Sequence, residues 1–213
     1  MRNVGLAALS GFIAKAPATA EAISRLKAGV PYPLPDDYVD LLRSVGDGEG
    51  FVGEQFVRFY SVDEVLLVRH VLGEVNLAGD LVIVGSNGAG EALAYDYRES
   101  APRLVMVGFI PLDYKFIKVL AGTLSEYLQD GRPSEARKGS FLGQTARART
   151  PVPGLIGKEI HHIKPIIFGG DPVDPQNKQA VTLSEYMPLV VWWNRLYRDT
   201  KNREGTGSGT NTA

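Results

Sequence analysis

The sequence predicts an α+β fold in which a mixed or antiparallel sheet is flanked by helices. Apolar residues at helical spacing are interspersed with short runs at strand spacing. Turn residues join the strand runs, without the regular strand–helix–strand rhythm that indicates a parallel sheet. With 213 residues, of which 44% are hydrophobic, the chain is long enough for one full core and a smaller appendage.

Two helices open the first predicted domain. Thr19 can cap a helix that runs to about Ala28, where Gly29 ends it. Pro35 marks the first position of a second helix, which ends before Gly46. The apolar residues of this second helix recur at spacings of three and four and therefore share one face: Tyr38, Leu41, Leu42 and Val45.

The pattern then changes to that of a strand. The glycines between positions 46 and 50 are expected in a turn, since glycine readily adopts positive φ. The alternation over Gln55–Tyr60 predicts a strand. Ser61 and Glu64 have the spacing of a capping box, which predicts a helix over Val65–Leu72.

A hairpin and a closing helix complete the domain. Leu81–Val84 predicts a buried strand, and Ala92–Tyr97 is its expected partner after a tight turn at Asn87-Gly88. The glycine-rich stretch at 85–90 lacks the Lys-Ser/Thr ending of a phosphate-binding loop, and a strand follows it rather than a helix. The last expected elements are a strand over Arg103–Phe109 and an amphipathic helix over Phe116–Leu128.

The composition divides the chain after residue 130. Residues 1–130 are expected to form one domain, and residues 131–157, rich in Gly, Pro, Ser, Arg and Lys, a basic linker. A second small unit is expected over residues 158–200, followed by a disordered tail over 201–213. The longest apolar runs, such as Leu189–Trp193, are too short to span a bilayer, so we expect no membrane partner. The small and apolar residues through Ala16 weakly resemble a signal peptide but are interrupted by Ser10, Gly11 and Lys15, so we expect a cytoplasmic protein.

The charges are divided in the same way. Residues 1–130 contain 11 lysines and arginines against 17 aspartates and glutamates, whereas residues 131–213 contain 12 against 7. An acidic half suits a basic protein ligand, and a basic half suits nucleic acid. A solvated surface with no partner is the alternative explanation. The chain has no cysteine, which excludes disulfides and thiolate metal sites.

Several short motifs in residues 20–130 together resemble the SUKH superfamily. They are Leu-Pro-Asp-Asp-Tyr (34–38), Leu41-Leu42, Gly46, Gly48-Glu49-Gly50, the run from Leu81 to Glu91, and Ala94-Tyr95-Asp96. The resemblance implies an interaction domain that binds and neutralises a specific toxin in bacterial contact-dependent systems. It therefore predicts an immunity protein with a cognate toxin as partner.

An acidic surface on this domain would speed association with a basic nuclease toxin. The candidate partner-binding residues are Asp36, Asp37, Asp40, Asp47, Glu49 and Glu54. No catalytic group of residues is evident in this domain. Its one histidine, His70, lies in a helical apolar stretch and is interpreted as structural.

The second unit resembles the HNH (ββα-metal) nuclease motif. The resemblance rests on Glu159-Ile160-His161-His162-Ile163-Lys164-Pro165, Phe168-Gly169-Gly170-Asp171 and Asn177. It implies a small ββα unit in which His161 holds a metal ion, His162 is the general base, and Asn177 orients that base or joins the metal. Such an ion would offset the charge that develops on a phosphate during hydrolysis.

The motif is incomplete at its helix. Tyr186 stands where the resemblance requires a metal-binding histidine, and Val190 stands one turn later. The chain has three histidines in all, so none can substitute. Thr182 and Glu185 form a capping box, and Pro188 in the second turn predicts a helix that is bent or begins late. We therefore interpret the unit as a degenerate HNH-like segment.

Side chains around this segment have further possible roles. Trp192, Trp193 and Tyr197 are expected to form the hydrophobic face of the last helix. Basic residues of the unit could contact phosphates without cleaving them: Lys158, Lys164, Lys178, Arg195 and Arg198.

Three functional hypotheses remain. The preferred one is a binding protein, with no enzymatic activity and no cofactor, that neutralises a toxin through its SUKH-like domain. The alternative is a metal-dependent HNH-type endonuclease, which would use a divalent ion and act on nucleic acid. In that case the SUKH-like domain would serve recognition or self-immunity. The third is a scaffold in which neither activity survives.

Overall fold

The structure, a computed structural model, describes residues 9–53, 55–130 and 153–206 and is built around a seven-stranded sheet. Every pair of neighbouring strands is antiparallel, and the spatial order follows the chain. The strands are β1 (Leu9–Ala14), β2 (Gly48–Val52), β3 (Gln55–Phe59), β4 (Leu81–Ser86), β5 (Glu91–Asp96), β6 (Arg103–Gly108) and β7 (Lys118–Ala121). The predicted α+β class, with helices flanking the sheet, is confirmed.

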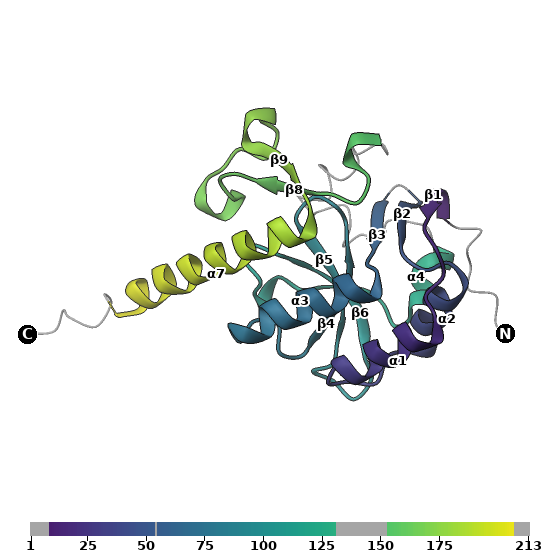
Figure 1. The fold of residues 1–213 in the computed structure, drawn as a ribbon. Helices are drawn as coiled ribbons and strands as arrows, with labels where there is room; N and C mark the ends of the chain where they lie inside the picture. Colours follow the sequence, from purple (N-terminus) through teal and green to yellow (C-terminus); the bar gives the residue numbers. More distant parts are fainter. Residues whose placement is uncertain (1–8, 54, 131–152, 207–213) are drawn as a thin grey trace, which may run out of the picture.

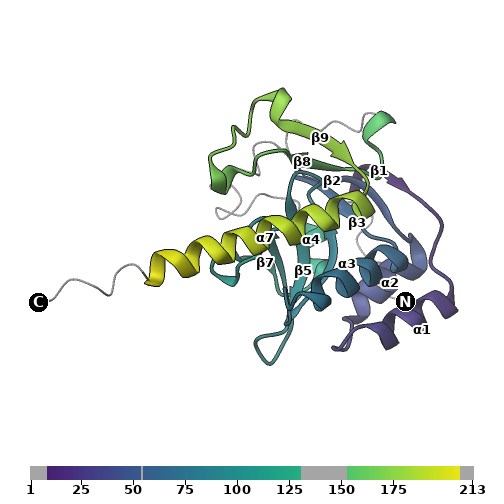
Figure 2. The ribbon, with the colours of Figure 1, turned by 60° about the vertical axis from the view of Figure 1, so that its left-hand side comes forward.

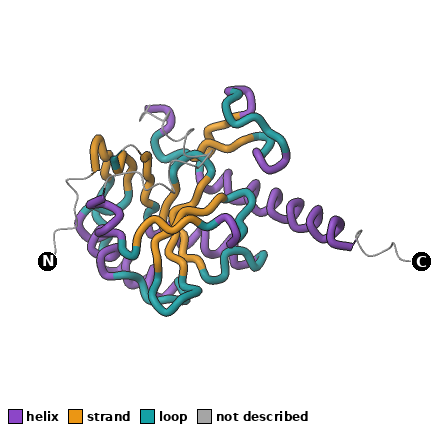
Figure 3. Tube along the Cα trace, turned by 180° about the vertical axis from the view of Figure 1, so that it is seen from behind, coloured by secondary structure: helices purple, strands orange, loops and turns teal. Residues whose placement is uncertain are grey.

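Five α-helices accompany the sheet in the described ranges: α1 (Ala20–Gly29), α2 (Asp36–Ser44), α3 (Val62–Glu74), α4 (Leu124–Asp130) and α7 (Leu183–Thr206). The helix α3 packs on β4 and lies between α1 and α7 (Figures 1 and 2). Seen from behind, the strands themselves face the viewer (Figure 3). None of these helices has the length and hydropathy needed to cross a bilayer.

The helix starts follow the predicted capping chemistry. The hydroxyl of Thr19 accepts the amide of Ala22 at the start of α1. Ser61 and Glu64 form both bonds of a capping box at the start of α3. Pro35 is the residue before α2 rather than its first helical residue. The strands predicted between residues 55 and 109 are confirmed to within two residues at each end.

The helix predicted over Phe116–Leu128 is wrong. A 3₁₀ turn, η2 (Tyr114–Phe116), is followed by β7, which pairs with β6, and only then by the short helix α4. The chain turns at Gly122, and the Thr123 hydroxyl accepts the amide of Glu126 at the start of α4. Sheet pairing therefore overrides the helical periodicity of this stretch.

The strands β1 and β2 were not predicted. The glycines of β2 suggest a turn, but the aromatic ring of Phe12 in β1 packs against them. A β-carbon on Gly50 would lie 2.6 Å from the α-carbon of Phe12. Of these glycines, Gly46 does have the positive φ of a turn, at +82°. Gly48 and Gly50 instead allow the close approach of a neighbouring strand.

The C-terminal segment forms a two-stranded sheet followed by α7. Its elements are η3 (Pro153–Leu155), β8 (Glu159–His162), η4 (Ile166–Phe168), η5 (Pro175–Asn177), β9 (Lys178–Val181) and α7. Thr182 and Glu185 cap α7, which continues past Pro188 to Thr206, so the predicted late start is wrong. Residues 201–206 belong to α7 and not to the tail, while most of the linker and the rest of the tail lie outside the described residues.

The buried face of α7 packs on α3 and on the core of the main sheet. The hydrophobic cluster that includes residues of β4, β5, β6 and α3 also contains Val181 of β9 and, from α7, Leu183, Tyr186, Met187 and Val190. Contacts between α7 and α3 continue this packing. The C-terminal segment and the first domain therefore share one core.

Candidate functional site

The tandem histidines end the strand β8, which lies with β9 above α7 in Figure 1. In the β8–β9 pairing, His161 lies opposite Gln179 and His162 opposite Lys178. Because side chains alternate along a strand, His161 shares its side of β8 with Glu159. The sequence predicts a helix after the pair, which the structure confirms in α7, but it does not assign the pair to a strand.

Both histidines are buried beside a small cavity. They are 4% and 7% exposed, and they line a space of about 40 Å³ together with Gly90, Ile110, Pro165, Ile166 and Tyr186. Within the described chain, Nδ1 of His161 and Nε2 of His162 have no hydrogen-bond partner. Two unpaired imidazole nitrogens are therefore held next to one cavity.

Burial sets the charge state of these imidazoles. Desolvation lowers the pKa of His161, and the nearby His162 lowers it further. Desolvation also lowers the pKa of His162, with a smaller contribution from the positive charge of Lys178, while a bond to the carbonyl of Pro172 opposes the shift. Both rings are consequently neutral near pH 7, the form in which imidazole accepts a proton or binds a metal.

Asn177 holds the loop between β8 and β9. Its side-chain oxygen accepts the amide of Lys164 at 2.8 Å. Its side-chain nitrogen donates to the carbonyl oxygens of Lys164 at 3.0 Å and Asp171 at 2.9 Å. A β-carbon on Gly170 would collide with the same carbonyl of Lys164, so the loop closes tightly here. The amide of Asn177 is thus committed to the loop backbone.

Tyr186 stands on α7 beside His161, at the position that the motif would give to a helical ligand. Its ring lies 5.7 Å from that of His161 and 5.3 Å from that of Phe109. Burial raises the pKa of the Tyr186 phenol far above its usual value, and the charge of Glu159 adds to this, so the side chain is neutral. Val190 is fully buried in the core.

The described residues contain no cluster of three or more histidine, aspartate or glutamate side chains arranged to hold a metal ion. Asp171, the acidic residue of the Gly-Gly-Asp turn, accepts the amides of Val173 and Asp174. A resident metal would therefore depend on the two imidazoles and on water. Only part of the donor set that the motif requires is present.

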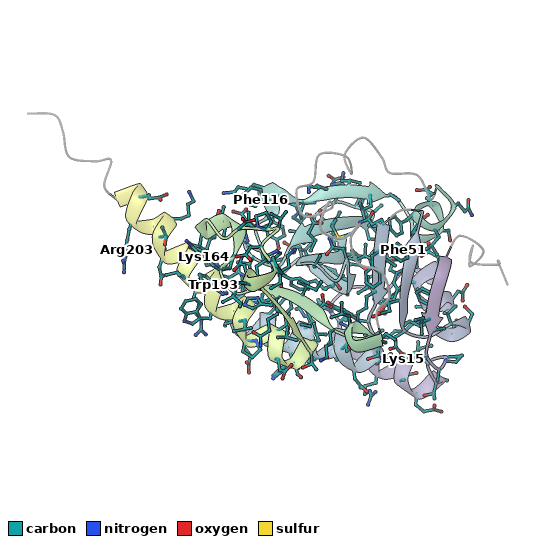
Figure 4. The ribbon with its side chains drawn as sticks, turned by 90° about the horizontal axis from the view of Figure 1, so that it is seen from above. Lys15, Phe51, Phe116, Lys164, Trp193 and Arg203 are labelled. Carbon is teal, nitrogen blue, oxygen red and sulfur yellow. The ribbon has the colours of Figure 1, made fainter. Side chains whose placement is uncertain are left out.

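The aromatic residues of α7 differ in exposure. Tyr197 is buried as predicted, and its hydroxyl accepts a hydrogen bond from Lys115 at 2.8 Å. Trp193, which Figure 4 labels on α7, is half-buried against Phe168 of the loop after β8, with ring centroids 4.9 Å apart. Trp192 is 56% exposed, so its predicted place on the buried face is wrong.

The basic residues of the segment differ in their contacts and in their exposure. Arg198 donates to the carbonyl oxygens of Val75 and Asn76 and so fastens α7 to the end of α3. Lys164 and Arg195 are exposed, whereas Lys158 and Lys178 are half-buried. The expected phosphate contacts of these side chains stay a prediction.

A buried ion pair joins β8 to the main sheet. The carboxylate of Glu159, which is 0% exposed, accepts hydrogen bonds from Arg58 at 2.7 Å and from Tyr60 at 3.0 Å. The hydroxyl of Ser86 donates to the same carboxylate. Arg58 also pairs with Glu64. Burial alone would lower the pKa of Arg58, but the charges of Glu159 and Glu64, the Tyr60 side chain and the hydrogen bond to Glu159 together outweigh it and raise that pKa.

This cluster was not predicted. Arg58 and Glu159 are 101 residues apart. No short sequence motif contains both residues, so nothing in the sequence indicates that they form a pair. Arg58 stands in an alternating strand, where it would ordinarily face solvent. The one available signal is a charged residue inside a run of large apolar residues, between Val57 and Phe59.

The acidic candidates on α2 lie at or near the surface. Asp36 is exposed, and Asp40 forms an ion pair of 3.6 Å with Arg43. Asp37 is half-buried and accepts the amide of Ser125 at the start of α4. The structure therefore brings these three carboxylates together on one helix.

The remaining acidic candidates lie elsewhere. Asp47 pairs with Lys15 at 2.8 Å. Glu49 is 3% exposed and accepts the amide of Gly157, so it is withdrawn from the surface, in contrast to the expectation from the sequence. Glu54 lies outside the described residues.

His70 also differs from its interpretation as a structural histidine. Its side chain is 72% exposed on α3, and its Nε2 lies 3.5 Å from the carboxylate of Glu74 on the next turn. It is therefore a surface residue, far in the sequence from the tandem histidines.

A protein-family model matches the first domain, and one solved structure is similar over most of the chain. The model of the SMI1 / KNR4 family (SUKH-1) matches residues 17–130, from the loop before α1 to the end of α4. No curated protein matches the chain. Among solved structures, the crystal structure of Atu4351 from Agrobacterium tumefaciens is similar, with 16% sequence identity and a TM-score of 0.48. That similarity covers 89% of this chain and 88% of the other.

Proposed function

The chain belongs to the SMI1 / KNR4 family (SUKH-1), and from this premise we propose that it is a toxin-neutralising immunity protein. Its family domain binds a cognate toxin, and the C-terminal unit over residues 158–200 is a degenerate HNH-like segment. The observation that carries the proposal is the family match over residues 17–130, which takes in six of the seven strands of the main sheet. The proposed place of this neutralisation is the cytoplasm.

The proposed partner is a basic protein, such as a nuclease toxin. The family domain lies within the acidic part of the chain, and Asp36, Asp37 and Asp40 lie together on α2. A cluster of like charge steers an oppositely charged partner and raises the association rate more than it changes the dissociation rate. The surface of α2 is therefore the proposed contact face.

Co-expression tests this function. Each toxin encoded next to this chain is expressed in bacteria with and without the protein, and growth is measured. Rescue by the wild type, with a complex isolated from the same cells, supports the proposal. Failure of rescue with every adjacent toxin would reject it and leave a scaffold without this activity.

Charge reversal on α2 tests the contact face. The double variant Asp36→Lys and Asp40→Lys should bind the toxin more slowly, by about tenfold or more at low salt. Glu74→Lys is the matched control, because Glu74 is an exposed acidic residue on α3. Equal association rates for the two variants would show that α2 is not the contact face.

A metal-dependent HNH-type endonuclease is the second candidate. The observation that favours it is the pair of buried, unpaired imidazole nitrogens beside one cavity. In that case His161 would hold a divalent ion, which supplies charge for the phosphate, and His162 would accept a proton from water. Against it stands Tyr186 in place of a second nitrogen ligand, since a neutral phenol is a poor substitute for imidazole.

A plasmid-nicking assay separates the two candidates. The full chain is incubated with plasmid and with magnesium, manganese, nickel or zinc in turn. His162→Ala tests the proposed base, and His70→Ala is the control because His70 is exposed and distant in sequence. Metal-dependent nicking that His162→Ala abolishes and His70→Ala preserves would establish the nuclease. No nicking with any of the metals supports the degenerate interpretation.

A further inference from the structure

The face of α7 that points away from the core carries large apolar side chains. Trp192 is 56% exposed and Leu196 is 37% exposed. Pro188, also exposed, lies one turn before Trp192, so the three residues follow one face of the helix at intervals of four. Large apolar residues gathered on one surface mark an interaction site more often than residues scattered singly. Figures 1 and 2 show α7 extending beyond the body of the protein.

The same face carries opposite charges at its two ends. Glu185 lies seven residues before Trp192, and Arg203 lies seven residues after Leu196. A separation of seven residues is two helical turns, so all four side chains share the face. Glu185, Trp192, Leu196 and Arg203 are all exposed. The ends of the stripe are therefore acidic and basic and its centre is aromatic and aliphatic, while the exposed Asp199 lies between the centre and the basic end.

The two ends and the centre of the stripe are complementary to themselves when the direction of the helix is reversed. Suppose that a second α7 lies antiparallel on the first and that the two helices are centred at the height of Asn194, which itself is buried on the other side of the helix. Trp192 then faces the partner subunit's Leu196. Glu185 then faces the partner subunit's Arg203, and each contact occurs twice. The apolar pair and the charged pair specify the same midpoint independently. A two-fold interface requires this kind of self-complementary surface.

We propose that a second copy of this chain docks on this face, with the two α7 helices antiparallel about a two-fold axis at Asn194. The stripe from Glu185 to Arg203 is about 27 Å long, enough for a continuous helix pair. Trp192 is the expected centre of the interface, since tryptophan is strongly enriched among the residues that dominate binding energy. These residues lie outside the family match and outside α2, so the dimer is independent of the proposed immunity function.

Sedimentation equilibrium of the full chain over the micromolar range tests the dimer. The wild type should associate reversibly, and Trp192→Glu should raise the dimer dissociation constant by at least about a hundredfold, because both copies lose the aromatic contact. Val173→Glu is the control, since Val173 is an apolar residue that is 70% exposed in the loop between β8 and β9. A wild type that stays monomeric, or a Trp192→Glu variant that dimerises like the wild type, overturns the proposal.

A charge exchange tests the antiparallel register. Arg203→Glu alone should weaken the dimer by about tenfold, because like charges then face each other at both ends. Adding Glu185→Lys should restore part of the affinity, which damage to the fold cannot do, although this change also removes the bond between Glu185 and the amide of Thr182. Circular dichroism confirms that each variant keeps its helix. A double variant no tighter than Arg203→Glu alone would overturn the register.

Discussion

Replacement of Glu159 by glutamine tests the connection between the C-terminal segment and the main sheet. The substitution keeps the size of the side chain and removes its charge. Arg58, which is only 4% exposed at its side chain, then loses the partner to which it donates at 2.7 Å. Tyr60 and Ser86 still have an amide oxygen to which they can donate. The change therefore isolates the charge of the buried pair.

The expected loss of stability is about 3 kcal/mol. Removal of one member of a buried ion pair costs about 3–5 kcal/mol, because the remaining charge is left without compensation. Glu64 still pairs with Arg58, which brings the expected cost to the lower end of that range. A domain of ordinary stability has about 5–15 kcal/mol in all, so the change is readily measured.

Urea unfolding followed by circular dichroism measures the loss. At a typical slope for a chain of this size, about 3 kcal/mol corresponds to a shift of the midpoint by about 1 M urea. Glu74→Gln is the control, since it breaks an exposed pair with His70 and should cost less than about 0.5 kcal/mol. Limited proteolysis should release the C-terminal segment of Glu159→Gln at lower urea than that of the wild type.

A double-mutant cycle with Arg58→Met identifies the cause. If the pair is coupled, the double variant should be more stable than the sum of the two single losses predicts, by at least about 1 kcal/mol. A midpoint for Glu159→Gln within experimental error of the wild type would refute the reasoning. So would strict additivity in the cycle.

Three further outcomes are expected. The lowered pKa values of His161 and His162 mean that the unfolded chain binds more protons than the folded one at mildly acidic pH. The free energy of unfolding should therefore fall as pH drops below about 6.5, by up to about 1.4 kcal/mol per pH unit for each histidine; a flat profile from pH 7.5 to 5 in urea titrations would contradict this. Asn177→Ala should cost about 2 kcal/mol, because three backbone groups of the loop lose a partner, and an unchanged urea midpoint would argue against the bracing role. Gly46→Ala should cost at least about 2 kcal/mol, since φ is +82° and the new β-carbon would lie 2.0 Å from a backbone oxygen; Gly73→Ala, which has open space in α3, is the control and should leave the melting temperature unchanged or raise it.

The parts of the fold that the sequence predicts are those decided by local chemistry. Thr19 and Ser61 mark helix starts because their hydroxyls accept amides only three residues away. The hairpin between β4 and β5 is equally local, since Asn87 bonds the backbone of Ala89 and Glu91 in the turn. Such signals do not depend on the rest of the chain.

The elements that were missed depend on distant strands. The glycines of β2 look like turn residues until Phe12 is placed against them. The residues Lys118–Ala121 look helical until β6 is available as their partner. In both places the deciding contact comes from a neighbouring strand, and periodicity within a short window cannot represent it.

The candidate site divides in the same way. The capped helix was predicted from the spacing of Thr182 and Glu185, whereas no strand was predicted for the histidines. The role of Asn177 as a brace of the loop, and the connection of Glu159 to Arg58, depend on which groups meet in space. The exposure of Trp192 was missed because an apolar helical pattern does not show which face has a neighbour to cover it.

The separation of Arg58 from Glu159 also affects how the protein is made. Ribosomes add about 5–20 residues each second, so the 101 residues between the two take roughly 5–20 seconds to synthesise. Throughout that interval, the guanidinium of Arg58 has not yet met Glu159, the partner with which it is later buried. Folding of this region is therefore completed only when the segment that carries Glu159 emerges, and a chaperone that acts during that delay would meet Arg58 before Glu159 pairs with it.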